Sequence, residues 1–149
     1  MSTPSDSDVD VLVVGAGQAG LGAAYWLTRD ANLSVRVIDR APLGESWRER
    51  WDSLQLFTPR RFSSLPGLAF ADGPTRCPSR LEMADYLVAY AAHHALPVAT
   101  GVTVTRLARD GGGFLAETSE GKIRARHVVL ATGPFHLPFI PDAGEGLSE

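Results

Sequence analysis

The strongest constraint on the fold is a glycine-rich turn between a short apolar run and an alanine-rich segment. Val9 to Val14 is typical of a strand buried on both faces of a parallel sheet. Gly15, Gly17 and Gly20 follow with G-x-G-x-x-G spacing. The first glycine would permit a tight turn, the second a close approach to pyrophosphate, and the third close helix–strand packing. The pattern predicts a strand, a turn and a helix whose N-terminus favours phosphate.

A second apolar run and an acidic residue stand where such a unit requires them. The first helix is predicted over residues 19–27, and the next strand over residues 35–38. Asp39 follows, about 20 residues after the last glycine, as expected for the carboxylate that binds a ribose hydroxyl. Its charge would repel a 2′-phosphate, so we expect the adenosine of FAD or NAD rather than NADP.

The remaining segments extend this α/β pattern. Residues 41–65 combine arginines with aromatics, which suits either a ligand with phosphates and flat rings or a surface loop anchored by tryptophans. A short helix is expected over residues 45–51. Ser79 and Glu82 form a capping box, which predicts a helix over residues 79–95 that is ended by Pro97. Its apolar stripe is predicted to comprise Leu81, Ala84, Leu87, Val88 and Ala91.

Alternating segments at 98–107, 114–118 and 122–126 predict a small antiparallel β-meander packed on the nucleotide-binding half. Residues 128–131 are predicted to form another buried strand. The length fits one domain. We expect a flexible tail over residues 1–8, the domain over 9–141 and the start of a linker over 142–149.

Composition and charge exclude several function classes. The net charge of −3 leaves no electrostatic footprint for nucleic acid or an anionic membrane. The single cysteine, Cys77, excludes an internal disulfide, a Cys-only zinc site and a C-x-x-C pair. An acidic N-terminus, without an apolar run of about 18 residues, indicates a cytoplasmic protein with no membrane span. No metal site is predicted, because the adjacent His93 and His94 would point in different directions.

Five segments together resemble the N-terminal FAD-binding part of flavin-containing monooxygenases. They are VVGAGQAG (13–20), VIDR (37–40), GESWRERWDSLQLFTPRRFSSLPG (44–67), CPSRLEMADYLVAYA (77–91) and VVLATGPFHLPFIP (128–141). The chain is most similar to CzcO-like flavoproteins, which are relatives of the group B monooxygenases and plant YUCCA enzymes. This resemblance implies an α/β, Rossmann-like FAD/NAD(P)-binding domain with a parallel sheet plus a small antiparallel β-meander. In the resembled family the meander strands form a second sheet.

The resemblance also implies cofactor contacts, which we group by the part of FAD that they would touch. The pyrophosphate contacts would be Gly15, Gly17, Gln18, Ala19 and Gly20, with Arg40 or Arg48 balancing the phosphate charge. The remaining contacts would be Asp39 at the adenosine ribose, Ser46 and Trp47 at the pyrophosphate–ribityl region, Thr58 near the flavin, the Val104 backbone at adenine, and the Thr132 and Gly133 backbone. No side chain stands out as a catalytic acid, base or nucleophile, and Asp52 and Asp85 are expected to be structural.

The sequence leaves two functions open. One is the FAD-binding portion of an NADPH-dependent flavoprotein monooxygenase-type oxidoreductase that acts on a small molecule. The alternative is a non-catalytic dinucleotide-binding module or a subunit of a split flavoenzyme. In the resembled enzymes an NADPH-binding domain and a final FAD-domain segment follow, so we expect a truncated chain, inactive without a missing C-terminal domain or partner chain. A disulfide oxidoreductase is disfavoured, because GESWRERW stands where its C-x-x-x-x-C pair would follow Asp39.

Overall fold

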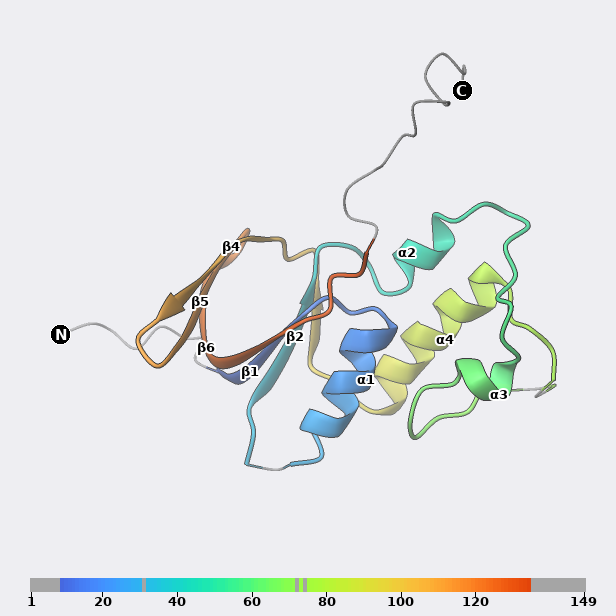
Figure 1. Cartoon of the computed structure of the whole chain (residues 1–149), viewed down its shortest axis with the longest axis horizontal. Coiled ribbons are helices and arrows are strands. Elements are labelled where there is room, and N and C mark those ends of the chain that lie inside the picture. Colours follow the sequence, from blue (N-terminus) through green and yellow to red (C-terminus); the bar gives the residue numbers. More distant parts are fainter. Residues whose placement is uncertain (1–8, 31, 72, 74, 135–149) are drawn as a thin grey trace, which may run out of the picture.

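A six-stranded sheet with the order β3-β2-β1-β6-β5-β4 runs through the molecule. The computed structural model describes residues 9–30, 32–71, 73 and 75–134. Helices cover one side of the parallel strands, and the β4–β6 meander extends on the other side (Figure 1). The elements are β1 (Val9–Val14), α1 (Gln18–Leu27), β2 (Val35–Asp39), α2 (Glu45–Arg48), α3 (Arg60–Ser63), α4 (Arg80–His93), β3 (Val98–Thr100), β4 (Val104–Asp110), β5 (Gly113–Thr118) and β6 (Gly121–Leu130). The predicted α/β, Rossmann-like class is confirmed.

The parallel half of the sheet is centred on β1, which explains its continuous apolar run. β1 pairs in parallel with β2 on one edge and with β6 on the other. Val13 lies opposite Val37 of β2 and Val129 of β6. Leu12 and Val13 are fully buried, one on each face, as expected for a strand covered on both sides. The two strands predicted around the glycine-rich turn are therefore confirmed.

The meander is confirmed, but its strand boundaries differ from the prediction. Residues 98–107 do not form one strand, because Gly101 adopts a φ of +78° and separates β3 from β4. β3 then pairs in parallel with β2, far from β4 in the strand order. Residues 122–126 and 128–131 were predicted to be separate strands, yet β6 is continuous. Its first half pairs antiparallel with β5 and its second half pairs parallel with β1.

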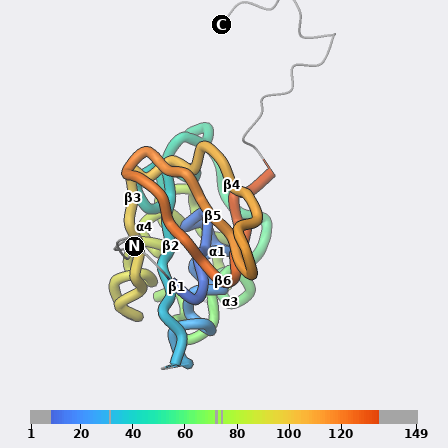
Figure 2. The backbone as a smooth tube through the Cα atoms, turned by 90° about the vertical axis from the view of Figure 1, so that its left-hand side faces the viewer, coloured from blue at the N-terminus to red at the C-terminus, as the bar shows by residue number. Residues whose placement is uncertain are grey.

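Continuity of β6 makes the meander part of the same hydrogen-bonded sheet, so the expected second sheet is wrong. The meander nevertheless packs on the parallel half, as predicted. Leu12, Val14 and Ile38 from the parallel strands share a buried cluster with Ala116 and Ile123 from the meander. Figure 2 shows β5 and β6 passing in front of β1 and β2 in this arrangement.

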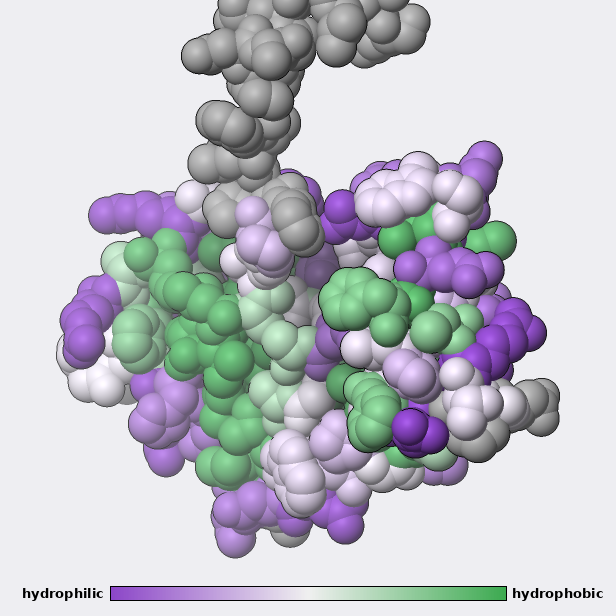
Figure 3. Space-filling model, turned by 45° about the vertical axis from the view of Figure 1, so that its right-hand side comes forward, coloured by the Kyte–Doolittle hydropathy of each residue, from purple (hydrophilic) through white to green (hydrophobic). Residues whose placement is uncertain are grey.

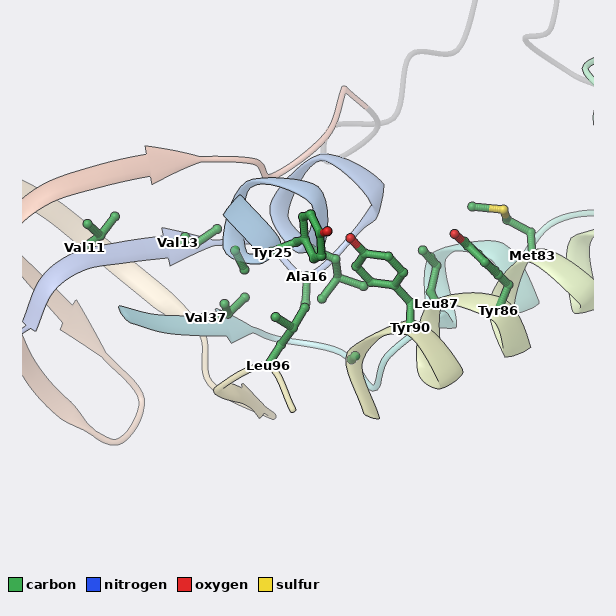
Figure 4. Packing of buried hydrophobic residues seen from close by; sticks show 13 residues of the cluster. Val11, Val13, Ala16, Tyr25, Val37, Met83, Tyr86, Leu87, Tyr90 and Leu96 are labelled. Carbon is green, nitrogen blue, oxygen red and sulfur yellow. The ribbon is translucent and has the colours of Figure 1, made fainter. Parts of the chain in front are cut away.

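The opposite face of the parallel strands packs against α1 and α4. Val11, Val13 and Val37 share one cluster with Tyr25 of α1 and Tyr90 of α4 (Figure 4). The predicted stripe of α4 is only partly correct. Leu81 and Val88 are 48% and 40% exposed. The buried face instead comprises Met83, Ala84, Tyr86, Leu87, Tyr90 and Ala91.

Tyrosines can occupy that face because their hydroxyl groups find backbone partners. The Tyr86 hydroxyl accepts the Leu65 N–H at 2.6 Å and donates to the Leu68 carbonyl at 2.7 Å. The Tyr90 hydroxyl donates to the Pro66 carbonyl at 2.7 Å. α4 thereby holds the 65–68 turn against the core, which a stripe of aliphatic residues would not do.

Both ends of α4 have well-formed caps. The Ser79 hydroxyl accepts the Glu82 N–H at 3.3 Å, and the Glu82 carboxylate accepts the Ser79 N–H at 2.8 Å, which confirms the capping box. The C-terminal end is not set by Pro97. Ala95 adopts a left-handed φ of 48°, and the Leu96 N–H donates to the Ala91 carbonyl at 3.0 Å in a Schellman arrangement.

α2 is shorter than the helix predicted over residues 45–51. It ends at Arg48, whose carbonyl accepts a hydrogen bond from the Arg80 guanidinium. Among the described residues, no helix is long and apolar enough to cross a membrane. The predicted tail over residues 1–8 and linker over 142–149, and the domain end at 141, lie outside the described residues.

Candidate functional site

The carboxyl ends of β1, β2 and β6 meet at the glycine-rich turn. Gly15 has a φ of +105°, a backbone conformation that side-chain-bearing residues rarely adopt. Its N–H donates to the Ile38 carbonyl at 2.8 Å, and the Ala131 N–H donates to the Val14 carbonyl at 2.8 Å. A Cβ on Gly15 would collide with the Ala131 carbonyl. The turn is therefore fixed by strands that are far apart in the sequence.

The other two glycines of the fingerprint have different surroundings. A Cβ on Gly20 would collide with the Gly15 carbonyl, so this glycine permits the close packing of α1 on the turn. A Cβ on Gly17 would meet nothing within 4 Å. Gly17 therefore borders open space, which is where a ligand could approach the backbone.

The N-terminus of α1 leaves hydrogen-bond donors available at this open side. Gly17 is the N-cap and supplies no side chain to cap the helix. The first helical bond runs from the Leu21 N–H to the Gly17 carbonyl at 2.9 Å. The N–H groups of Gln18, Ala19 and Gly20 precede that bond and have no acceptor within the helix. Such donors, together with the helix dipole, favour an anion.

Asp39 holds the glycine-rich turn as well as bordering it. One carboxylate oxygen accepts the Ala16 N–H at 2.7 Å, and the other accepts the Ala41 N–H at 2.9 Å. The Asp39 carbonyl also accepts the Val102 N–H at 2.9 Å. Each carboxylate oxygen retains acceptor capacity for a ligand hydroxyl. The side chain predicted to bind ribose is therefore already oriented by backbone donors.

A pocket lies between the glycine-rich turn, the 39–46 segment and α4. Its lining residues are Ala16, Gly17, Asp39, Ala41, Pro42, Gly44, Glu45, Ser46 and Leu87. Three of these, Gly17, Asp39 and Ser46, were predicted from the sequence. The fold therefore brings candidates from the glycine-rich turn and from the 39–46 segment together at one pocket.

Sequence reasoning missed the rest of the lining because long-range packing creates it. Gly44 has a φ of +81°, and a Cβ there would lie 2.7 Å from the Ala84 carbonyl. This close approach places the start of α2 against α4 and brings Glu45 beside Leu87 at the pocket. The glycine before a short helical segment was the one available signal.

Several predicted cofactor contacts do not line this pocket. Arg40 is exposed, and Trp47 packs against the buried cluster between the sheet and helices α1 and α4. The Thr58 hydroxyl lies 2.8 Å from the Ser63 hydroxyl, and Val104 packs against the meander-side cluster. The predicted FAD contacts of these four residues stay predictions.

Thr132 lies close to the turn, and Gly133 follows it. A Cβ on Gly15 would lie 3.1 Å from the Thr132 backbone nitrogen. Gly133 has a φ of +76° and open space around its Cβ position. Their position beside the turn is compatible with the predicted backbone contacts. His136 and the prolines at 138 and 141 lie outside the described residues.

The arginines near the pocket pair with carboxylates of the protein. Arg48 lies 2.9 Å from Asp85, and Arg80 pairs with Asp52. Asp52 and Asp85 therefore have the structural role expected from the sequence. In the part of the chain that the structure describes, no arginine or lysine lines the pocket.

Glu82 connects the same region to the capping box of α4. It accepts hydrogen bonds from Arg60 and Arg76. The Ser79 backbone N–H, followed by the Ser79 side chain and the two arginines, lowers the pKa of Glu82 against the opposing effect of burial. This network ties Arg60 of α3 and Arg76 to the first turn of α4.

The aromatics of residues 51–62 lie largely on the surface. Trp51, Phe57 and Phe62 are 61%, 96% and 69% exposed. Leu130 at the end of β6 is also 66% exposed. Figure 3 shows a face of the molecule with an apolar band and, beyond a hollow to its right, smaller apolar groups. The described part of the chain holds no cluster of three or more His, Cys, Asp or Glu side chains suited to a metal ion.

Comparison with known proteins gives one family model and many relatives. The family model described as pyridine nucleotide-disulphide oxidoreductase matches residues 12–145. A CzcO-like oxidoreductase of Geobacillus kaustophilus, described as uncharacterized, is 45% identical over 141 residues, covering 95% of this chain and 40% of the relative. Indole-3-pyruvate monooxygenase YUCCA1 of Oryza sativa is 35% identical over 136 residues, covering 88% of this chain and 33% of the relative.

A solved structure gives the same picture. A flavin-containing monooxygenase from Stenotrophomonas maltophilia superposes with a TM-score of 0.81 at 33% identity, covering 91% of this chain and 42% of that chain. These matches confirm the resemblance drawn from the sequence. The chain spans about two-fifths of the length of the CzcO-like relative and of this solved structure.

Proposed function

Because the chain belongs to the pyridine nucleotide-disulphide oxidoreductase family, we propose that it is the FAD-binding portion of an NADPH-dependent, monooxygenase-type flavoprotein. The observation that carries this proposal is the open N-terminus of α1, with unused N–H donors beside an oriented carboxylate, Asp39. The similarity to a flavin-containing monooxygenase supports FAD as the dinucleotide.

The residues present fit the adenosine and diphosphate part of such a cofactor. The open space at Gly17 is a cradle that a Cβ would fill, and the N–H groups of residues 18–20 can donate to phosphate oxygens. Asp39 can accept a ribose hydroxyl, and Ser46 lies at the same pocket with a hydroxyl of its own. We propose that these residues bind and orient the cofactor, and that Thr132 and Gly133 contact it through their backbone.

Bound FAD would supply the electron-transfer chemistry. The chain's own residues would hold the cofactor at the pocket between the glycine-rich turn, the 39–46 segment and α4. We propose that oxidation of NADPH and of a small-molecule substrate needs sequence corresponding to the other three-fifths of the relatives. The single cysteine cannot form a dithiol pair within the chain, which argues against disulfide reductase chemistry here, and it supports a cytoplasmic location.

The test is an absorption spectrum of the purified chain after incubation with FAD and desalting. Retained flavin should be lost in Gly17→Val, which fills the cradle, and in Asp39→Ala, which removes the oriented carboxylate. Gly112→Val is the matched control, because a Cβ at Gly112 also meets nothing within 4 Å but lies in the β4–β5 turn. A folded chain that retains no flavin, or equal retention in all three variants, would contradict the proposal.

The alternative is a non-catalytic dinucleotide-binding module or one subunit of a split flavoenzyme. This alternative is supported by the length of the chain, which covers only about two-fifths of the CzcO-like relative and of the solved flavin-containing monooxygenase. Whether it is a module or a subunit of a split enzyme, the FAD-loaded chain by itself should not oxidise NADPH. A split enzyme predicts that activity appears when a separately made C-terminal portion of a relative is added, whereas a module predicts that none appears.

A further inference from the structure

Glu45 is a pocket residue to which neither the sequence pattern nor the resemblance assigned a role. It is the first residue of α2, is half-buried, and lines the same pocket as Asp39 and Gly17. Within the described ranges, no hydrogen bond or ion pair joins the Glu45 carboxylate to another side chain. Nearby acids differ in this respect, because Asp52 and Asp85 are paired with arginines. The Glu45 carboxylate is therefore free to act on whatever occupies the pocket.

The charges around the pocket indicate how an unpaired Glu45 carboxylate would affect a ligand. Among the residues that the structure describes, its lining holds the carboxylates of Asp39 and Glu45 and no arginine or lysine. Among the described lining residues, the group that favours an anion is the α1 N-terminus at Gly17, on one side of the pocket. A phosphate can be accommodated at that side, whereas a ribose 2′-phosphate elsewhere in the pocket would face the two carboxylates. Hydroxyl groups would instead find two acceptors.

We infer that Glu45 is a specificity-determining residue that makes this pocket select a free adenosine ribose and reject a ribose carrying a 2′-phosphate. This inference rests on the proposed function, because it requires an adenine dinucleotide in the pocket. Asp39, held by the Ala16 and Ala41 N–H groups, is fixed in place. Glu45, which has no such partners, supplies the second negative charge. The pocket thereby keeps NADPH out of the site that holds FAD.

The experiment compares NAD⁺ and NADP⁺, which differ only in the 2′-phosphate, by calorimetry on the whole chain. The unmodified chain should bind NAD⁺ more tightly. Glu45→Gln should reduce this preference by about tenfold, mainly through tighter NADP⁺ binding, as expected for removal of one charge near a phosphate. Glu49→Gln, a control in the exposed residue that follows α2, should change the preference by less than about twofold. The unmodified chain and Glu45→Gln should differ less in their preference for NAD⁺ over NADP⁺ when the salt concentration is raised.

The outcomes separate this inference from the proposed function. If Glu45→Gln strengthens NAD⁺ and NADP⁺ equally, Glu45 acts on the diphosphate that both ligands share, and the assignment is overturned. If NAD⁺ binds but Glu45→Gln behaves like Glu49→Gln, the assignment fails while dinucleotide binding stands. A chain that unfolds cooperatively but binds neither FAD nor NAD⁺ overturns both. Circular dichroism melts of each variant exclude misfolding as the cause.

Discussion

Alanine at Gly20 should destabilise the fold, whereas alanine at Gly17 should leave stability nearly unchanged and reduce cofactor binding. A Cβ on Gly20 would lie well inside 3.0 Å of the Gly15 carbonyl oxygen, a separation that real Cβ atoms essentially never show, and 3.5 Å from the Ala131 side chain. Because the obstacle is backbone rather than a flexible side chain, either α1 or the turn has to move. The cofactor cradle cannot survive that displacement unchanged.

The magnitude follows from two opposing contributions. Alanine stabilises a helix interior by about 1 kcal/mol relative to glycine. Overpacking of a well-packed site costs about 1–3 kcal/mol, and the rigid backbone obstacle places Gly20→Ala near the upper end. The net loss in the free energy of unfolding should be about 2 kcal/mol, which lowers Tm by about 4–8 °C for a chain of this size.

Gly17→Ala should be nearly neutral for stability. Its φ of −78° suits alanine, and a Cβ would meet nothing within 4 Å. The poorer N-cap costs less than about 1 kcal/mol. The new methyl group instead occupies the side from which a phosphate approaches, so flavin retention should fall while Tm stays within about 3 °C.

Thermal melts followed by circular dichroism, with flavin retention measured on the same samples, test both variants. If Gly20→Ala and the unmodified chain have the same Tm, the argument that Gly20 permits the close packing of α1 on the turn is refuted. Undiminished flavin retention in Gly17→Ala would refute the placement of the phosphate at the open side of the turn.

Three further changes address α4. Ala95→Gly should raise the free energy of unfolding in urea by about 1 kcal/mol, because glycine adopts the left-handed φ of 48° without strain. If stability does not rise, the left-handed C-terminal cap of α4 at Ala95 is refuted. Tyr86→Phe should lower stability by about 1–3 kcal/mol in the same assay, because the Leu65 N–H loses its acceptor; a neutral effect would show that water replaces the hydroxyl. The pKa of Glu82 is lowered, chiefly by the Ser79 backbone N–H, so its contribution is complete above its ordinary value of 4.5 and is lost as pH falls through the lower folded-state pKa. Glu82→Gln should therefore be less stable at pH 7 and lose less stability below pH 4.5, and parallel pH profiles would contradict this.

The sequence predicted those parts of the site that depend on neighbouring residues. The apolar run, the glycine spacing and Asp39 fall within residues 9–39, and they form the strand, turn, helix and strand that their pattern indicates. The capping box of Ser79 and Glu82 is equally local, and it is present in the structure. These features could be predicted because the residue pattern that signals each of them lies within one short stretch of sequence.

The errors lie where distant segments decide the outcome. Alternation over 98–107 could not reveal that Gly101 divides it, or that β3 joins β2 at the opposite end of the sheet from β4. The stripe assigned through Leu81 and Val88 was wrong, because the core selects the face whose tyrosines can reach the 65–68 turn. The pocket lining at 41–45 depends in the same way on the approach of Gly44 to α4.

The arginines near the pocket illustrate why composition alone left two interpretations open. Arginine and aromatic residues together suit a phosphate-bearing ligand, yet Arg48 and Arg80 are directed to carboxylates that hold the irregular segment in place. The pocket itself is left with backbone donors from α1 and with acidic side chains. Recognition there must depend on directed hydrogen bonds rather than on net positive charge, because a diphosphate can bind only where the N–H groups of residues 18–20 point. A site of this kind fixes the orientation of a dinucleotide more strictly than a basic patch does, and its acidic side selects the part of the ligand that carries free hydroxyl groups.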